Sequence, residues 1–203
     1  MRRGFTLLEM MVVMGIIALL IGVSVAGYSR MTKTAETARA QELVANTATA
    51  LTALYNKEGA WPQRLLSEGK NDGRLDERTA YLLAKKEVMS LTTEGGKLAG
   101  FDRFGIITPW AQAVVKRLGQ KATVGSKVGS RTVQDHILHF AIDTDGDGII
   151  EGVSVGGENL TIRATAAVWC IGKSGGDKGQ PWPYSRGLSH DDVYSWSREQ
   201  VKK

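Results

Sequence analysis

Three carboxylates in the second half of the chain stand in a pattern suited to binding a hard cation. Asp143, Asp145 and Asp147 are followed by Gly148. Alternate carboxylates can converge on Ca²⁺ when a glycine permits the sharp turn that follows them. A complete calcium loop of this type would end on a bidentate Glu, but Ser154 stands at that position. The same run is a good turn sequence without any metal. The sequence therefore leaves two interpretations, a Ca²⁺ site and a metal-free turn.

Apart from these carboxylates, no set of residues in the sequence has the spacing of a catalytic site. The chain lacks a G-x-S-x-G nucleophile motif, a phosphate-binding P-loop and a dinucleotide-binding glycine pattern. Its single cysteine, Cys170, cannot form an intrachain disulfide, and one Cys with three His does not suggest a zinc cluster. We therefore expect a protein that is not an enzyme.

Length and charge restrict the fold and the partners. The 203 residues suit one domain with a core, or one domain with an appendage. A hydrophobic share of 42% and a charged share of 23% argue against a disordered chain and against a multi-span membrane protein. The net charge is only +5 and no five basic residues are consecutive, so we expect no nucleic-acid partner.

The first 58 residues contain no proline and only four glycines, which predicts a long helix. Residues 10–29 are twenty consecutive uncharged residues. A helix of about twenty apolar residues is long enough to span the hydrocarbon core of a bilayer. Because a short basic N-terminus commonly stays in the cytoplasm, Arg2 and Arg3 favour a C-terminal domain on the outside.

Three interpretations compete for this segment: an uncleaved anchor, a secretory signal peptide and a more specialised segment. Residues 24–26, Ser-Val-Ala, resemble a signal-peptide cleavage site, but the apolar run before them is longer than such peptides carry. Glu9 lies directly before this run, within an otherwise apolar stretch. A carboxylate in a membrane helix is costly and requires a partner, so Glu9 is the informative residue.

The N-terminal sequence MRRGFTLLEMMVVMGIIALLIGVSVAGYS resembles that of type IV prepilins and of the pseudopilins of type II secretion systems. The likeness consists of a basic leader ending at Gly4, Phe5 as first mature residue, Glu9 as the fifth, and an apolar helix. It implies cleavage between Gly4 and Phe5 by a prepilin peptidase, N-methylation of Phe5, and assembly into a filament. Glu9 cannot easily fold back along its own helix to the Phe5 ammonium. It would instead pair with that of a neighbouring subunit and fix the axial register.

Residues 30–58 continue the helical pattern in amphipathic form. One arc of the helical wheel is mostly apolar and the opposite arc is polar, so this part should cover a sheet. Gly59, followed by Trp61 and Pro62, should end the helix. The alternative is two separate helices that meet near Ser29. The mostly apolar stripe comprises Leu43, Val44, Thr47, Ala48, Leu51, Leu54 and Tyr55.

The remaining residues predict two short helices followed by strands. Asp76 is positioned to cap a helix over residues 77–91, and Thr108 with Pro109 to begin a helix that Gly119 ends. β-branched and aromatic residues then become frequent, which indicates an antiparallel meander joined by a turn-rich segment. The predicted strands are residues 132–143, 160–171 and 192–196.

The C-terminal run DDVYSW resembles the acidic signature of the major pseudopilin of type II secretion, in which aspartates and neighbouring carbonyls hold Ca²⁺. The resemblance implies Asp191 and Asp192 as ligands, with Asp177 upstream. A long loop without a disulfide is entropically costly to order, and an ion would hold it. The alternative is a solvated acidic turn. Type IV pilins more often close this region with a disulfide, so a single cysteine favours a pseudopilin.

The sequence thus predicts an α+β pilin fold, a long N-terminal helix with a transmembrane first half packed on a small antiparallel β-sheet. The predicted segments are a leader (1–4), a transmembrane half-helix (5–29), an amphipathic half-helix (30–58) and a periplasmic globular domain (59–203). The predicted function is that of a structural subunit of a type II secretion pseudopilus, single-pass in the inner membrane. Expected partners are further copies, minor pseudopilins, the prepilin peptidase and the inner-membrane secretion platform. A type IV pilus subunit and a monomeric membrane-anchored calcium-binding module are the alternatives.

Overall fold

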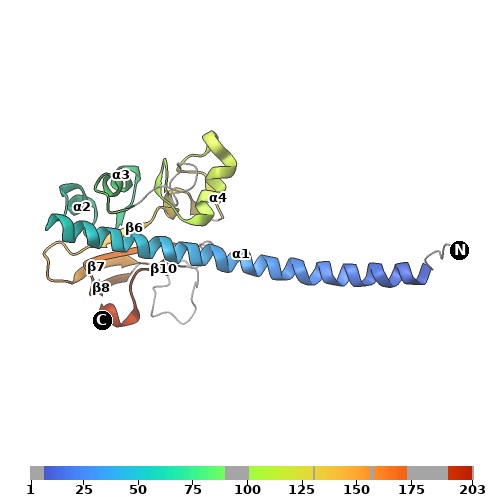
Figure 1. The fold of residues 1–203 in the computed structure, drawn as a ribbon. Coiled ribbons are helices and arrows are strands. Elements are labelled where there is room, and N and C mark those ends of the chain that lie inside the picture. The colour runs from blue at the N-terminus through green and yellow to red at the C-terminus, as the bar shows by residue number, and fades with distance from the viewer. Residues whose placement is uncertain (1–6, 90–100, 130, 156–157, 173–191, 203) are drawn as a thin grey trace. The chain divides into compact units, whose positions relative to one another are not determined.

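The computed structural model describes residues 7–89, 101–129, 131–155, 158–172 and 192–202 (Figure 1). The fold is α+β, as predicted, and the strand pairs of the described residues are antiparallel. Two compact units divide the chain, Met1–Ala38 and Arg39–Lys203. The helices are α1 (Leu7–Glu58), α2 (Gln63–Glu68), α3 (Glu77–Lys85) and α4 (Pro109–Leu118), with 3₁₀ turns η1 (Gly119–Lys121), η2 (Gln134–His136) and η3 (Arg198–Gln200).

The strands of the described residues form two larger sheets and two short hairpins. One sheet has the order β1-β6-β9-β10, the other the order β11-β8-β7, and β2-β3 and β4-β5 are two-stranded. Their bounds are β1 (Gly73–Arg74), β2 (Phe101–Asp102), β3 (Gly105–Ile106), β4 (Lys127–Val128), β5 (Arg131–Thr132), β6 (His139–Ile142), β7 (Ile150–Val155), β8 (Glu158–Ile162), β9 (Ala166–Cys170), β10 (Val193–Tyr194) and β11 (Val201–Lys202).

Helix α1 is continuous from Leu7 to Glu58, so the alternative of two separate helices near Ser29 is wrong. The helix ends where the sequence predicts. Gly59 adopts a left-handed φ of +70° and its N–H donates to the Tyr55 carbonyl oxygen at 2.8 Å. A glycine takes this conformation without the steric penalty that a side chain would bring.

In the first unit, large apolar side chains of α1 are exposed at nearly every position of the first four turns. Their exposed fractions lie between 44% and 79%. Among the helices of the described residues, none combines the length and the apolarity that a membrane span requires. The span predicted over residues 10–29 is not confirmed by this finding. The exposed side chains are Leu7, Leu8, Met10, Met11, Val12, Val13, Met14, Ile16, Ile17, Leu19, Leu20 and Ile21.

In the second unit, the predicted stripe of α1 is confirmed. Val44, Thr47, Leu51 and Leu54 are fully buried, whereas Glu42, on the opposite arc, is exposed. The buried stripe belongs to the same apolar core as Phe140, Ile142, Val168 and Cys170 of the four-stranded sheet. The helix therefore covers one face of that sheet, as its periodicity predicts.

Strands β6 and β9 are buried on both faces because a second core lies on the other side of the four-stranded sheet. Ala141, Ala167 and Trp169 alternate with the residues that face α1, and they pack with side chains of the three-stranded sheet and with Trp196. Successive residues of a strand point to opposite faces, so each strand contributes to both cores. The four-stranded sheet is the middle layer of the second unit.

The predicted strand over residues 132–143 is only partly right. Its middle forms η2, because the Asp135 carboxylate accepts hydrogen bonds from Thr132 N at 2.9 Å and Thr132 Oγ1 at 2.8 Å. Such local side-chain bonds stabilise a turn against the β propensity of the surrounding residues. The strand β6 therefore begins only at His139.

The predicted strand over residues 160–171 is two strands that belong to different sheets. It breaks between β8 and β9, where Arg163 N donates to the Gln200 carbonyl and Asp143 N to the Thr165 carbonyl. The segment before it, predicted as turns, contains the strand β7. The short final strand predicted at residues 192–196 is confirmed as β10, which pairs with β9.

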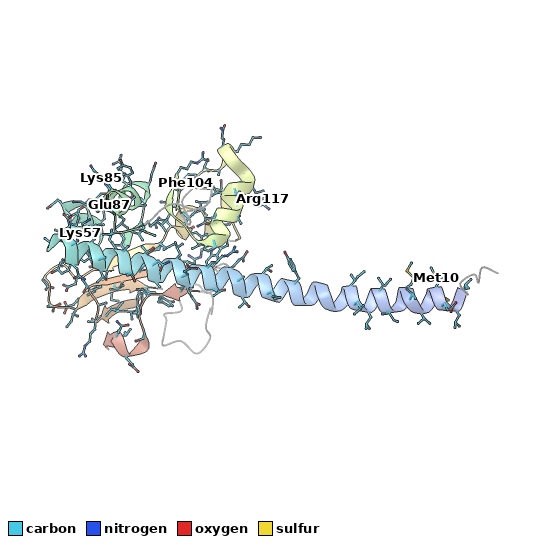
Figure 2. All side chains as sticks on the ribbon, viewed as in Figure 1. Met10, Lys57, Lys85, Glu87, Phe104 and Arg117 are labelled. Atoms are coloured by element: carbon cyan, nitrogen blue, oxygen red, sulfur yellow. The ribbon has the colours of Figure 1, made fainter. Side chains whose placement is uncertain are left out.

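Helix α3 begins as predicted but ends six residues early, at Lys85 rather than near Leu91. Glu87 has a left-handed φ of 57°, Glu87 N donates to the Ala84 carbonyl and Val88 N to the Leu83 carbonyl. This pattern is a Schellman end, usually built on glycine. Figure 2 shows Glu87 beside Lys57 of α1, and Lys57 Nζ donates to the Lys86 carbonyl at 2.9 Å.

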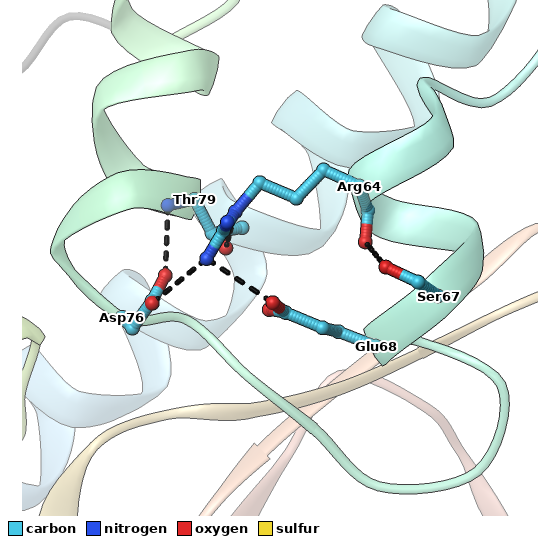
Figure 3. Close-up of polar contacts among 5 residues, drawn as sticks. All are labelled: Arg64, Ser67, Glu68, Asp76 and Thr79. Atoms are coloured by element: carbon cyan, nitrogen blue, oxygen red, sulfur yellow. Dashed lines mark hydrogen bonds and ion pairs between the residues drawn. The ribbon is translucent and has the colours of Figure 1, made fainter.

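The N-terminus of α3 is held by an ion-pair network around Arg64 (Figure 3). Asp76 caps the helix by accepting from Thr79 N at 2.8 Å, as predicted, and its other oxygen lies 2.9 Å from Arg64 Nη2. Arg64 Nη2 is also 3.1 Å from Glu68 Oε1. Burial alone would raise the pKa of Asp76, but the Thr79 hydrogen bonds and the Arg64 charge hold it below its ordinary value.

Candidate functional site

The N-terminal processing residues predicted from the sequence, Gly4 and Phe5, lie outside the described residues. Glu9 lies in the first turn of α1 and is exposed. A carboxylate in a first helical turn interacts favourably with the partial positive charge of the helix N-terminus. Around Glu9 the helix exposes Leu7, Leu8 and Met10. A single acidic group is thus placed on a helix surface that is otherwise apolar.

The carboxylates of Asp143, Asp145 and Asp147 come together in the turn between β6 and β7. One ligand oxygen from each lies within 4.8 Å of the others. Asp143 is buried, with its Oδ1 accepting from Gly146 N at 2.8 Å and its Oδ2 from Gly148 N at 2.7 Å. Asp145 and Asp147 are exposed. The buried aspartate therefore shapes the turn, and the other two carboxylates face the solvent.

This turn fits the requirements of a calcium site in its first half. Ca²⁺ binds oxygens at about 2.3 to 2.6 Å, so two oxygens on one ion lie at most about 5 Å apart. The spacing of the three carboxylates satisfies that limit. Asp143 Oδ1 accepts from both Asp145 N and Gly146 N, whereas Oδ2 accepts only from Gly148 N and so keeps a second lone pair for a metal. The ion's remaining ligands would have to be main-chain carbonyls and water.

Two aromatic residues near the end of α1 support this turn, and no sequence pattern signals their contact with it. Trp61 is buried and its Nε1 donates to the Asp143 carbonyl. The rings of Trp61 and Tyr55 lie 4.9 Å apart between centroids. A Cβ placed on Gly146 would lie 3.3 Å from the Tyr55 hydroxyl. The turn thus contacts residues that lie more than eighty positions away in the chain.

Of the C-terminal calcium residues predicted by resemblance, Asp177 and Asp191 lie outside the described residues. Asp192 precedes β10, and its Oδ1 accepts from Gly172 N at 2.6 Å. Burial and the Asp192 charge raise the pKa of the Cys170 thiol to about 12. The same two causes raise the pKa of the Tyr194 hydroxyl. The Asp192 carboxylate therefore connects Gly172 and Asp192, the two residues that flank the long C-terminal loop. Because its pKa is raised, Cys170 stays a neutral thiol.

His136 is the buried titratable group that links α4 to the sheet. Its Nδ1 accepts a hydrogen bond from Trp110 Nε1 at 3.0 Å, which requires that this nitrogen carry no proton. Among the described residues its Nε2 has no partner of good hydrogen-bond geometry. Burial lowers the pKa of His136 below 6.5, although the Val128 main chain and the Asp135 charge oppose the shift. His139, also buried, contacts Asp72, so both histidines are core residues.

Because the folded state keeps His136 neutral, we predict that acid destabilises the second unit through this residue. The unfolded chain binds a proton near pH 6.5, whereas the folded chain binds it only at lower pH. Stability is therefore complete above pH 6.5 and falls below it, by up to about 1.4 kcal/mol per pH unit, until the folded pKa is reached. Thermal unfolding of the detergent-solubilised chain between pH 5 and 8 measures the slope. His136→Gln should flatten it, and an identical slope in the variant would contradict the assignment.

Residues 1–25 match the family model described as a prokaryotic N-terminal methylation motif. The matched residues include Gly4, Phe5 and Glu9. This motif, the α+β fold and the relatives below make the chain similar to type IV pilin-like proteins.

Three curated relatives are pilins or fimbrial proteins. The chain is 27% identical over 103 residues to a type IV major pilin protein, PilE1, of Neisseria gonorrhoeae, covering 51% of this chain and 57% of the relative. A second PilE1 of the same species is 33% identical over 69 residues, covering 34% and 42%. A fimbrial protein of Neisseria meningitidis is 33% identical over 69 residues, covering 34% and 41%. The chain thus spans about half the length of the relatives it matches. No solved structure was found to match it.

Proposed function

We propose that this pilin-type subunit polymerises through α1 into the pseudopilus of a type II secretion system, where filament growth drives protein export. The observation that carries the proposal is the run of exposed apolar side chains from Leu7 to Ile21, within the residues that match the methylation motif. A helix that is apolar on all sides requires a cover. The inner membrane would supply it before assembly, and the helices of other copies would supply it in the filament. This work is mechanical and needs no catalytic group.

The second candidate is a subunit of a type IV pilus, and the curated relatives favour it because two carry the name type IV major pilin. The single cysteine favours the pseudopilus, since an intrachain disulfide cannot form. Deletion in the native host decides between them. Loss of secreted proteins from the medium with surface fibres intact supports the pseudopilus, whereas loss of surface fibres with secretion intact supports the pilus.

Processing gives the direct test of the pilin-like N-terminus. Cleavage after Gly4 should convert the chain of 203 residues into one of 199 that starts at N-methylated Phe5. Intact mass spectrometry of membrane-extracted protein measures both changes. A Gly4→Leu variant should keep its leader, because a bulky residue at the cleavage position would hinder the peptidase. An intact Met1 or a new start at Gly27 in the wild type would contradict the proposal.

We also propose that Ca²⁺ binds this subunit, either at the turn formed by Asp143, Asp145 and Asp147 or at the C-terminal loop with Asp177, Asp191 and Asp192. The spacing of the carboxylates supports the first position. The second rests on the resemblance of the C-terminal sequence and on the cost of ordering a long loop without a disulfide. In either place the ion would stabilise a loop of the folded chain.

The calcium proposal predicts a higher melting temperature in Ca²⁺ than in chelator. At a free concentration one hundred times its dissociation constant, one ion adds about 2.7 kcal/mol. For a chain of this size, about 1 kcal/mol raises the melting temperature by about 2 to 4 °C. Asp145→Ala with Asp147→Ala removes the rise if the first turn is the site, and Asp191→Ala with Asp192→Ala if the second is. An unchanged wild-type melting temperature in chelator would refute both sites.

A further inference from the structure

The charges of the second unit are segregated along the sequence into two blocks of opposite sign. Residues 103–134 contain six basic residues and no acidic residue, and residues 135–162 contain six acidic residues and no Lys or Arg. In residues 39–102, by contrast, the two signs are interspersed in equal number. The basic block comprises Arg103, Lys116, Arg117, Lys121, Lys127 and Arg131.

The basic block forms an exposed surface at the C-terminal end of α4, which we call the α4 surface, defined by Lys116, Arg117, Lys121 and Lys127. All four side chains are exposed, and none takes part in the ion pairs formed between described residues. Figure 2 shows Arg117 pointing away from the end of α4. The surface is rigid at its base, because Arg103 donates to the carbonyls of Gly119, Gln120 and Ala122.

The acidic block exposes Asp145, Asp147 and Glu151 at the turn between β6 and β7, which we call the β6–β7 surface. These three carboxylates also take no part in the ion pairs formed between described residues. Figure 1 shows this turn at one end of the second unit, beyond the end of α1, and α4 at the opposite end. The two surfaces of one copy therefore lie at different ends of its second unit.

We infer that the α4 surface of one copy binds the β6–β7 surface of the next copy, so that globular units associate head to tail. Opposite potentials on two surfaces attract and fix the register between partners. Because the surfaces differ and lie at opposite ends, the contact is heterologous and can repeat from copy to copy, as a filament requires. This inference rests on the proposed filament and names the contact that would orient its globular units.

Chemical crosslinking of the full-length chain in membranes of cells that assemble it tests this contact. Lys121→Cys with Glu151→Cys in one chain, treated with a bismaleimide in the presence of EGTA, should give a ladder of covalent oligomers. Each single variant should give dimers at most. The native Cys170 is buried and does not compete for the reagent. In the matched control, Lys85→Cys takes the place of Lys121→Cys and is combined with Glu151→Cys. Lys85 is an exposed lysine on α3 (Figure 2), and this pair should give no ladder.

Charge reversal tests whether electrostatic attraction makes the contact. In the double-cysteine chain, Lys116→Glu with Arg117→Glu should reduce the ladder at least fivefold, and adding Asp145→Lys with Asp147→Arg should restore most of it. Arg78→Glu with Lys85→Glu changes the net charge equally outside the α4 surface and should have no effect. Raising the salt from 0.1 to 1 M, which shortens the screening length from about 10 to about 3 Å, should weaken the ladder. Failure of the compensating reversal to restore it would overturn the inference.

A crosslink through α1 separates this inference from the proposed function. Met10→Cys lies on the exposed apolar part of α1 and reports association of the helices alone. Crosslinked Met10→Cys copies without a ladder from the globular pair would overturn the head-to-tail contact and leave the filament intact. Absence of both products would overturn the filament together with the contact.

Discussion

Glu9→Leu is expected to leave the chain in the membrane and to abolish its filaments. The variant removes the carboxylate that we propose to pair with the Phe5 ammonium of a neighbouring copy, and it makes the helix more apolar. Removing one partner of a buried ion pair costs about 3 to 5 kcal/mol. At about 1.36 kcal/mol per tenfold change, subunit association should weaken by roughly a hundredfold to several thousandfold. The ratio of sedimented filament to membrane-bound subunit, measured by immunoblot, reports the loss.

Two further variants identify the cause of that loss. Glu9→Gln keeps the size and the hydrogen-bonding oxygen but removes the charge, so it should impair assembly nearly as much. Met10→Leu changes an adjacent apolar side chain without touching the charge, and its filaments should form normally. Wild-type filament yield from Glu9→Leu would show that the pairing is not required for assembly.

Helices α1, α3 and α4 could be predicted from the sequence because their signals are local, whereas the six-residue α2 was not predicted. The 3.6-residue period of Val44, Leu51 and Leu54 identified the buried stripe of α1, and a polar residue with a hydrogen-bonding side chain marked the start of α3 at Asp76. The early end of α3 could not be predicted. Its left-handed residue is Glu87, whereas glycine is the residue that usually signals such an end.

The strand pairing was predicted only in part. β6, β9 and β10 pair antiparallel in the order of the three predicted strands, as a meander requires. The β7–β8 hairpin between β6 and β9 was not predicted, because its place in a separate sheet depends on contacts distant in the sequence. The same limit applies to the candidate calcium turn. Its three aspartates were evident from their spacing, whereas the Trp61 side chain that fixes the turn lies 82 residues away.

In the middle layer of the second unit, substitution of Phe140 should cause the largest loss of stability. This side chain is fully buried in β6, and its ring lies against two glycines. A Cβ on Gly69 would lie 2.4 Å from Phe140 Cε2, and a Cβ on Gly73 would lie 2.6 Å from Phe140 Cε1. Both glycines have ordinary negative or extended φ values, since neither is among the residues with positive φ. They are therefore required for space and not for backbone conformation.

Phe140→Ala is expected to lower the free energy of unfolding by about 3 to 5 kcal/mol, because it removes the buried ring and leaves a cavity. At about 2 to 4 °C per kcal/mol, the melting temperature of the detergent-solubilised chain should fall by about 6 to 20 °C. Phe140→Leu should lower the melting temperature less than Phe140→Ala does. Gly73→Ala should also destabilise the chain, but less so in the Phe140→Leu background, where part of the ring has been removed. The Glu68 carbonyl, 2.6 Å from the same Cβ, makes that relief partial. Strictly additive losses in this double-mutant cycle would show that the two positions are not in contact.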